Sequence, residues 1–271
     1  MNVFESGIPQ FGGVLLQFFT LVGLCGVRLL VIMIVFPPTS DQVLQGTTRN
    51  AVVMLWGAYI AFGQQALMPA LSGWHLVLLG AKEALIGLVM AFVASPVFWV
   101  AESVGTYIDD LTGYNNVQMS NPSQGQQSSL MATLMSQCAS VAFWTLGGMT
   151  LLLGALFESY RLWPLDSMTP VPAAMLQMFV MQQTDSLMET VAKVAAPALL
   201  LLLLVDVGIN LVSKTAQKLD LVSLAQPVKG GIAVLTIALL IGTFIGEVRD
   251  QVALVHIGEQ IRELATPHAR H

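Results

Sequence analysis

Six long apolar stretches constrain this chain more than any other feature of its sequence. They cover residues 12–36, 51–71, 76–101, 129–157, 194–213 and 230–246. Each is close to or above the ~20 residues with which an α-helix crosses the hydrocarbon core of a bilayer. Lipid offers no partners to backbone N–H and C=O groups, so a helix, which pairs them internally, is the expected structure. The sequence therefore predicts an all-α membrane protein of about six long hydrophobic helices.

The composition excludes several classes of protein. Hydrophobic residues make up 55% of the 271 positions and charged residues only 10%, whereas a soluble domain carries about 25% charge. The net charge of −5 comes with no basic patch, which argues against a nucleic-acid binder. A soluble enzyme and a disordered chain are excluded by the high apolar content. Cys25 and Cys138 both lie in apolar stretches and are interpreted as buried thiols.

Three segments between the apolar stretches do not resemble simple connections. Residues 102–128 are polar and contain neither Lys nor Arg, and a connection of this length is often functional. Residues 173–193 and 247–265 show the periodicity of amphipathic helices. The methionines of the first, at positions 175, 178 and 181, indicate either an adaptable docking face or ordinary packing. We find no internal repeat, so we predict a single integral-membrane domain over residues 1–271.

Four ionisable residues lie within the apolar stretches: Arg28, Lys82, Glu83 and Asp206. A charge at the centre of a bilayer costs at least about 2.5–3.5 kcal/mol, so each requires a partner or water. Lys82 and Glu83 are about 100° apart around a helix and need not pair with each other. We interpret the four as residues that pair between helices or subunits and fix assembly. The alternative is an ion relay.

The sequence contains no recognisable catalytic signature. It has neither a phosphate-binding GxxxxGK[ST] loop nor a GxGxxG turn, and neither a GxSxG elbow nor an HExxH pair. None of the four histidines has metal-ligand spacing. The predictions are therefore a protein that is not an enzyme, with no cofactor and no metal site.

Short motifs follow one another in a distinctive order along the chain. Glu102, Gly105, Asp109 and Gly113, followed by Asn121-Pro122, form the pattern E-x-VG-x-x-ID-x-x-x-G…NP. This pattern resembles that of the T subunit family of the type III secretion export apparatus. The distal part of the chain continues the resemblance with Asp206-x-Gly208, Lys214 and Pro227-Val228-Lys229. The resemblance also includes Arg28, Pro37, Arg49-Asn50, Glu158-Ser159-Tyr160 and Trp163-Pro164, so it spans nearly the whole chain.

The chain departs from the family pattern at a few positions. Asp110-Leu111-Thr112 stands where the family commonly has Asn-Gln-Arg, so a positive charge is lost. Lys214 replaces the usual Arg and Asp220 the usual Asn. The ID…NP form of the 102–128 segment resembles an injectisome subunit more than its flagellar counterpart.

The resemblance implies a place in a helical export gate. The expected partners are R-class and S-class small membrane subunits, the U-class export-switch protein, membrane lipid and, transiently, the secreted polypeptide; no nucleic acid is expected. Helices in tilted hairpins are implied, with the intramembrane charges facing neighbouring subunits. A plug-like loop is also implied, and by position it comprises Tyr114, Asn115, Asn116, Val117, Gln118, Met119, Ser120 and Asn121.

The function expected from this resemblance is structural. The chain would be a multi-pass subunit of the bacterial inner membrane that helps to form and close a conduit for unfolded proteins. The alternative function is a secondary transporter or ion channel that uses Lys82, Glu83 and Asp206 as a relay. Inverted repeats are common in such transporters, and none is apparent here.

Overall fold

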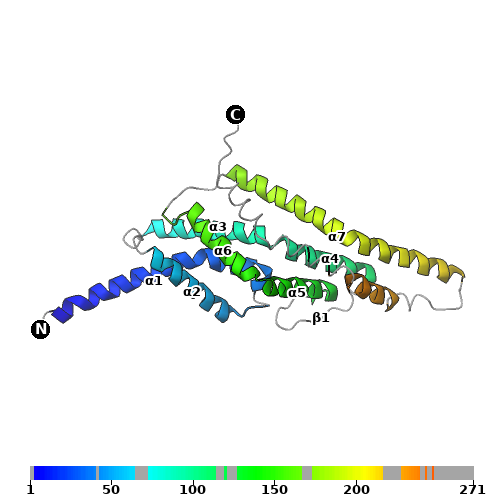
Figure 1. Ribbon diagram of the computed structural model, residues 1–271, viewed down its shortest axis with the longest axis horizontal. Coiled ribbons are helices and arrows are strands. Elements are labelled where there is room, and N and C mark those ends of the chain that lie inside the picture. The colour runs from blue at the N-terminus through cyan, green and yellow to red at the C-terminus, as the bar shows by residue number, and fades with distance from the viewer. Residues whose placement is uncertain are drawn as a thin grey trace, which may run out of the picture. The chain divides into compact units, whose positions relative to one another are not determined.

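The computed structural model describes residues 3–40, 43–64, 73–113, 119–120, 127–166, 173–215 and 227–238, together with the single residues 242 and 246. Over these residues the chain is almost entirely helical (Figure 1). The exception is a pair of two-residue antiparallel strands, β1 (Met119–Ser120) and β2 (Gln127–Ser128). The prediction of an all-α membrane protein is confirmed.

The chain divides into two compact units. The first comprises Met1–Ser95, Thr150–Leu176 and Val255–His271, and the second comprises Pro96–Met149 and Gln177–Leu254. The described elements of the first unit are α1 (Val3–Val35), the 3₁₀ turn η1 (Pro37–Thr39), α2 (Gly46–Gly63), α3 (Trp74–Ala94) and most of α6 (Gly148–Leu162). The second contains α4 (Pro96–Thr112), α5 (Leu130–Thr145), most of α7 (Ala173–Thr215) and the helix Pro227–Ala238. The single domain over 1–271 stays a prediction.

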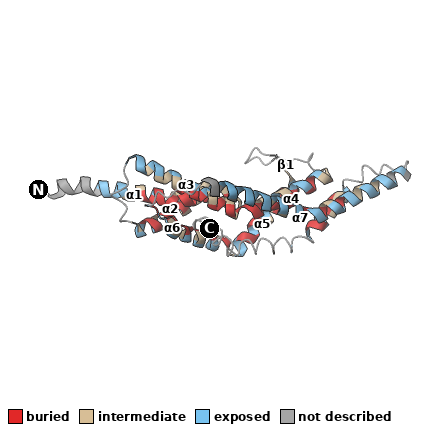
Figure 2. Cartoon of the chain, turned by 90° about the horizontal axis from the view of Figure 1, so that it is seen from above, coloured by how far each residue is buried: buried red, intermediate tan, exposed pale blue. Residues whose placement is uncertain are grey.

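The first unit is built around α1, which packs against both α2 and α3. Figure 2 shows an exposed stretch of α1 that gives way to a buried one. The buried stretch contains Leu21, Leu24 and Cys25, which form a core cluster with Ile60 of α2 and with Leu165. Burial of Cys25 agrees with its interpretation as an apolar, unpaired thiol.

Close approach of α3 to α1 depends on a glycine. A Cβ atom on Gly87 would lie 2.6 Å from the carbonyl oxygen of Arg28, a separation at which the backbone must shift. Only a residue without a side chain permits this packing distance. Gly87 is one helical turn from Glu83 on the same face of α3, so the close approach also brings Glu83 to Arg28.

The helix boundaries differ from the six predicted stretches. The stretch 76–101 is interrupted at Ser95, because Pro96 supplies no N–H and begins a new helix instead. The stretch 129–157 is interrupted at Leu146 and Gly147, where the positive φ of Gly147 (76°) ends α5. Residues 102–112, predicted to belong to a polar connection, form the second half of α4.

In the last part of the chain, by contrast, two segments that the sequence predicted as separate helices are joined. Residues 173–193 and 194–213, predicted as two helices, form the single 43-residue helix α7, which continues through Pro197. Three described helices are long and apolar enough to cross a membrane, or four if α5 and α6 are one broken span. Parts of the stretches 51–71 and 230–246 lie outside the described residues, so the number of six stays a prediction. The amphipathic segment 247–265 lies outside the described residues.

Candidate functional site

Arg28 is the centre of a buried polar cluster in the first unit. Its side chain is completely buried. Its Nε donates to Oε2 of Glu83 at 2.8 Å, and Nη1 donates to the Ser159 hydroxyl at 2.6 Å. Nη2 donates to the carbonyl oxygen of Trp163 at 3.1 Å, and the guanidinium lies 3.9 Å from the centroid of the Tyr160 ring. One cation therefore links α1, α3 and the end of α6.

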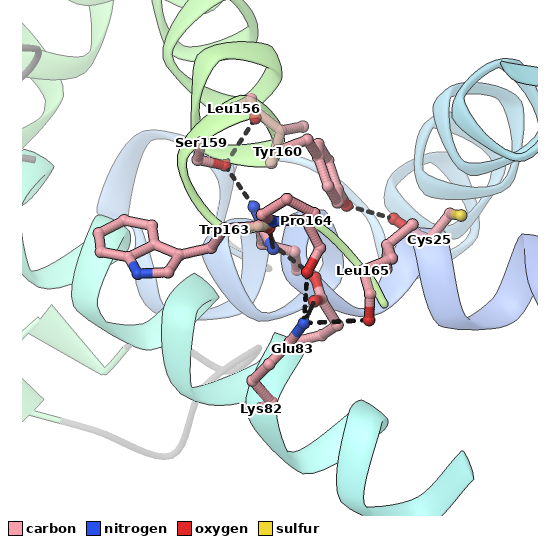
Figure 3. A network of polar contacts seen from close by, with 10 residues as sticks. Cys25, Lys82, Glu83, Leu156, Ser159, Tyr160, Trp163, Pro164 and Leu165 are labelled. Atoms are coloured by element: carbon pink, nitrogen blue, oxygen red, sulfur yellow. Dashed lines mark hydrogen bonds and ion pairs between the residues drawn. The ribbon is translucent and has the colours of Figure 1, made fainter. Parts of the chain in front are cut away.

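Lys82 extends this cluster from its edge. Its Nζ lies 3.1 Å from Oε1 of Glu83, and it donates to the carbonyl oxygens of Pro164 at 2.8 Å and Leu165 at 3.1 Å. Figure 3 shows Lys82 and Glu83 approaching the Pro164–Leu165 turn, with Ser159 and Tyr160 above them on α6. Helical geometry did not require Lys82 and Glu83 to pair, yet the long lysine stem brings its ammonium group back to the neighbouring carboxylate. We name Arg28, Lys82, Glu83, Ser159 and Tyr160 the Arg28 network.

The Arg28 network satisfies its charges within one unit. Glu83 is completely buried and receives both cations. A charge taken out of water requires a partner, and each carboxylate oxygen of Glu83 has one cation beside it: Oε2 accepts from Arg28 Nε, and Oε1 lies 3.1 Å from Nζ of Lys82. Arg28 of α1 and Glu83 of α3 therefore pair between two helices of one chain. Neither side chain has any exposed surface within this chain, which agrees with pairing between helices, one of the two kinds of pairing that the sequence indicated.

A second candidate site lies in the second unit, at the two ends of the 113–129 connection. Asp109, in the last part of α4, is completely buried. Its Oδ2 accepts a 2.7 Å hydrogen bond from the backbone N–H of Met131, in the first turn of α5. Ser129 caps the same helix by accepting from the N–H of Ala132 at 3.3 Å. A carboxylate at a helix N-terminus is favoured by the unpaired N–H groups there, so Asp109 joins the end of α4 to the start of α5.

The helices that flank this connection also approach each other closely. A Cβ atom on Gly105 would lie 2.6 Å from the backbone carbon of Met131. Between the helices, the strands pair Met119 with Ser128 and Ser120 with Gln127. Gly113 follows α4 with a φ of 76°, a conformation that glycine adopts without strain. We name Gly105, Asp109, Leu111, Gly113 and Met131 the loop base.

Most of the predicted plug lies outside the described residues. Met119 and Ser120 form β1, whereas Tyr114, Asn115, Asn116, Val117, Gln118 and Asn121 are not described, and neither is Pro122 of the family motif. The structure therefore describes the helices that carry the loop and the short pairing within it. The plug assignment stays a prediction.

Asp206 of α7 is paired with a residue that is distant in the sequence. Its Oδ1 forms an ion pair with Nζ of Lys229, in the first turn of the helix Pro227–Ala238. Lys229 also donates to the carbonyl oxygen of Leu111 at 3.3 Å, in the last turn of α4. One ammonium group thus links α7, the helix Pro227–Ala238 and the loop base.

The remaining motif residues have diverse environments. Glu102 and Lys214 are exposed, and Pro227 begins its helix, as proline often does because the first helical N–H is unpaired anyway. The ion-pair partners of Asp206 and Glu83 could not be derived from the spacing of residues in the sequence.

Over the described ranges, no three His, Cys, Asp or Glu residues are grouped so that they could hold a metal ion.

The fold and the two sites define an α-helical membrane protein in which charges within apolar helices are paired with partners from other helices. The chain belongs to the family described as bacterial export proteins, family 1, whose family model matches residues 19–255. This match covers most of the chain, including the Arg28 network and the loop base.

Individual relatives agree with this assignment. The chain is 32% identical to Yop proteins translocation protein T of Yersinia pestis over 215 residues, which cover 78% of this chain and 82% of the relative. It is 30% identical to the surface presentation of antigens protein SpaR of Salmonella typhimurium over 217 residues, or 78% and 79% of the two chains. The flagellar biosynthetic protein FliR of Bacillus subtilis is 26% identical over 168 residues, or 62% and 64%.

These comparisons confirm the resemblance to the T subunit family of type III secretion. They also confirm the prediction that the chain is not an enzyme, since the relatives are named as translocation, secretion and flagellar proteins. The relatives are translocation, secretion and flagellar proteins by name, which supports a secretion-system subunit. Pairing of Asp206 with Lys229, and of Glu83 with Arg28, gives these carboxylates a structural explanation.

Proposed function

We propose that this chain is a structural subunit of the export gate of a type III secretion system in the bacterial inner membrane. In this proposal it helps to build the conduit for unfolded secreted polypeptides and to close it. The family membership supports a role in export. The observation that supports closure is the loop base, where Asp109 and Gly105 of α4 contact the first turn of α5 and so join the two helices from which the polar connection departs.

The chemistry of the predicted plug suits a reversible closure. Residues 114–121 carry amide, hydroxyl and apolar side chains and no charge. Such groups form only ordinary hydrogen bonds, each with a net contribution of about 1 kcal/mol, so an unfolded chain would not be held by any strong interaction.

The exposed face of α7 supports assembly with other membrane proteins. Leu200, Leu203, Leu204 and Leu211 are each at least 59% exposed within this chain, and a large apolar surface marks a contact with lipid or protein. We propose R-class and S-class small subunits as the neighbours of such faces and the U-class switch protein as a further partner. The exposed Lys214 fits a segment that faces the cytosolic machinery.

The experiment that tests the proposal combines native mass spectrometry with ion leak. The chain is co-expressed with the small hydrophobic proteins encoded beside it, purified in mild detergent and reconstituted into liposomes. We expect one copy bound to several copies of two other subunits. Purification as a lone monomer or homodimer would contradict the export-gate assignment.

Closure is tested on the same preparation. Deletion of residues 114–121 should raise ion leak through the assembled complex, because the lumen loses its restriction. The matched control replaces these eight residues with glycine and serine, which preserves the length of the connection and separates the effect of the side chains from that of loop length. Unchanged leak in a complex of normal subunit composition would refute the plug.

A further inference from the structure

Helix α7 is buried along only part of its length. Its 43 residues form one continuous helix (Figure 1), which is about 65 Å long at a rise of 1.5 Å per residue. Four side chains on one face of it are buried: Val191, Ala195, Ala198 and Leu202. Between positions 177 and 190, in contrast, no described side chain is buried. A helix in a protein obtains most of its stability from packing, so the first part of α7 requires a partner that the rest of the described chain does not supply.

The pattern that is buried downstream continues upstream in exposed residues. Steps of three and four residues keep side chains on one face of a helix, and such steps lead back from Val191 to five further side chains. We name these five the upstream face: Val180, Met181, Thr184, Leu187 and Met188. Val180 is 40% exposed, and the two methionines are each 60% exposed. The apolar stripe of α7 therefore extends beyond the part of the helix that is covered.

The upstream face lies largely outside the hydrocarbon core of a bilayer. The apolar part of α7 that includes it, Val180–Val212, has 33 residues, or about 50 Å of helix. A hydrocarbon core about 30 Å thick holds only about 39 Å of helix even at a tilt of 40°. Asp185, Glu189 and Lys193 are exposed near the upstream end, so this end extends beyond the core. Water would meet the upstream face there, and covering apolar area that water meets is favourable.

The spacing and charge of the upstream face fit a second helix. Side chains in steps of three and four interlock with those of a helix that runs alongside, and methionine adapts its shape to such a neighbour. Asp185 follows Met181 by four residues and so borders the face. Glu189 is paired with Lys193, whereas Asp185 has no ion pair with a described residue. A carboxylate at the edge of an interface favours a partner with a basic residue opposite.

We propose that the upstream face is a docking surface for an amphipathic helix of a neighbouring subunit. The apolar stripe of that helix covers Met181, Leu187 and Met188, and a basic residue beside the stripe pairs with Asp185. This inference rests on the proposed function and deepens it, because it gives one partner of the assembly a place on this chain. The subunit composition of the complex tests the assembly, whereas contacts at the upstream face test this surface.

The first test is photo-crosslinking in the purified complex, with the subunits identified by native mass spectrometry. Benzoylphenylalanine replaces Met188 on the upstream face or, as the matched control, Ser186. Ser186 is also exposed and lies about 160° away around the helix. We expect an adduct from position 188 to a segment of another subunit with apolar residues in steps of three and four, and little or none from position 186. An adduct to lipid or to another part of this chain would overturn the inference, and so would equal yields from the two positions.

The second test introduces a charge at the same two positions. Met188→Asp places a carboxylate in the interface, and we expect the yield of complete complex to fall at least about tenfold, because an unpaired charge is strongly disfavoured there. Ser186→Asp should leave the yield unchanged. Both positions are exposed within this chain, so neither change disturbs its own fold, and circular dichroism of the purified chain checks this. Equal yields of complex from the two variants would refute the docking surface.

The basic partner is tested with Asp185→Asn. Charges at the edge of an interface act mainly on the rate of association. Assembly from purified subunits at low salt should slow by about threefold, and the difference from the wild type should shrink at high salt. An equal rate for the two chains at low salt would overturn the pairing of Asp185 with a basic residue. If the wild-type chain forms no complex, the proposed function fails; if a complete complex forms without an adduct from position 188, only the docking surface fails.

Discussion

Two ion-pair sites among the described residues, Arg28 with Glu83 and Asp206 with Lys229, solve the problem of charge in an apolar environment differently. In the first unit, Arg28 and Glu83 are completely buried and surrounded by further donors and acceptors. In the second unit, Asp206 and Lys229 are partly exposed and have fewer partners. The first arrangement holds helices together permanently, because separation of its members would leave a charge in a medium of low polarity. The second can be broken at a smaller cost.

This difference separates the polar residues that hold a buried core together from those that remain partly accessible. A fully enclosed network makes α1, α3 and the end of α6 one body. A pair that borders solvent or a neighbouring subunit can respond to changes there, because water or another charge can replace either partner. The comparison predicts large effects on stability in the first unit and small effects on stability in the second.

The largest loss of unfolding free energy is expected from Glu83→Gln. The change leaves Arg28 buried without its carboxylate, and breaking a buried pair from one side costs about 3–5 kcal/mol. We expect a corresponding loss of unfolding free energy in mixed detergent micelles, together with a loss of assembled complex. The control is Glu158→Gln, whose ion pair with Arg161 is exposed on both sides. Equal stability of the two variants would refute the distinction between the sites.

A double variant, Arg28→Met with Glu83→Met, sharpens this prediction. Replacing both partners of a buried ion pair with apolar residues is often neutral or stabilising. We therefore expect the double variant to recover most of the stability lost in Glu83→Gln. If it is as unstable as the single variant, the hydrogen bonds to Ser159 and Trp163 matter more than the ion pair.

The next largest loss of stability is expected from Gly87→Ala, which tests the close approach of α3 to α1. The added Cβ atom meets the carbonyl oxygen of Arg28 at 2.6 Å, and overpacking of this kind costs about 1–3 kcal/mol. Gly80→Ala on the same helix is the matched control, since nothing lies within 4 Å of its Cβ position. Thermal unfolding in mild detergent should separate the two. A lower melting temperature for Gly80→Ala than for Gly87→Ala would contradict the packing argument.

A smaller effect is expected from Asp109→Asn at the loop base. The amide oxygen can still accept from the N–H of Met131, but the bond loses its charge, at a cost of about 1 kcal/mol. Hydrogen exchange at the first turn of α5 should become faster, while exchange in α1 and α3 stays as in the wild type. Exchange that rises equally in both units would indicate a global loss of stability and not a local one.

The smallest effect on stability is expected from Asp206→Asn. Partly exposed ion pairs contribute between about 0 and 1 kcal/mol, so the melting temperature in mild detergent should change little. A melting temperature close to that of the wild type is the result that separates this site from the Arg28 network. A loss of stability as large as that of Glu83→Gln would place both ion pairs in the same category.

Several features of the fold could be predicted from the sequence, and the reasons are local. The long apolar stretches require helices, since the backbone must satisfy its own polar groups in lipid. Interruption of the third stretch at Pro96 follows from the absence of an N–H on proline. Pro197 shows the limit of such rules, because α7 continues through it. Proline within a membrane helix is tolerated where surrounding groups compensate for the freed carbonyl.

The sequence by itself determined the helical membrane class, the positions of the intramembrane charges and the order of family motifs. The tertiary structure decided which charges pair. Arg28 with Glu83, Asp206 with Lys229 and Asp109 with the N–H of Met131 join residues from different helices. The presence of a cation in an apolar stretch of the sequence indicates only that it requires a partner. Its identity depends on where packing, through residues such as Gly87 and Gly105, brings the helices together.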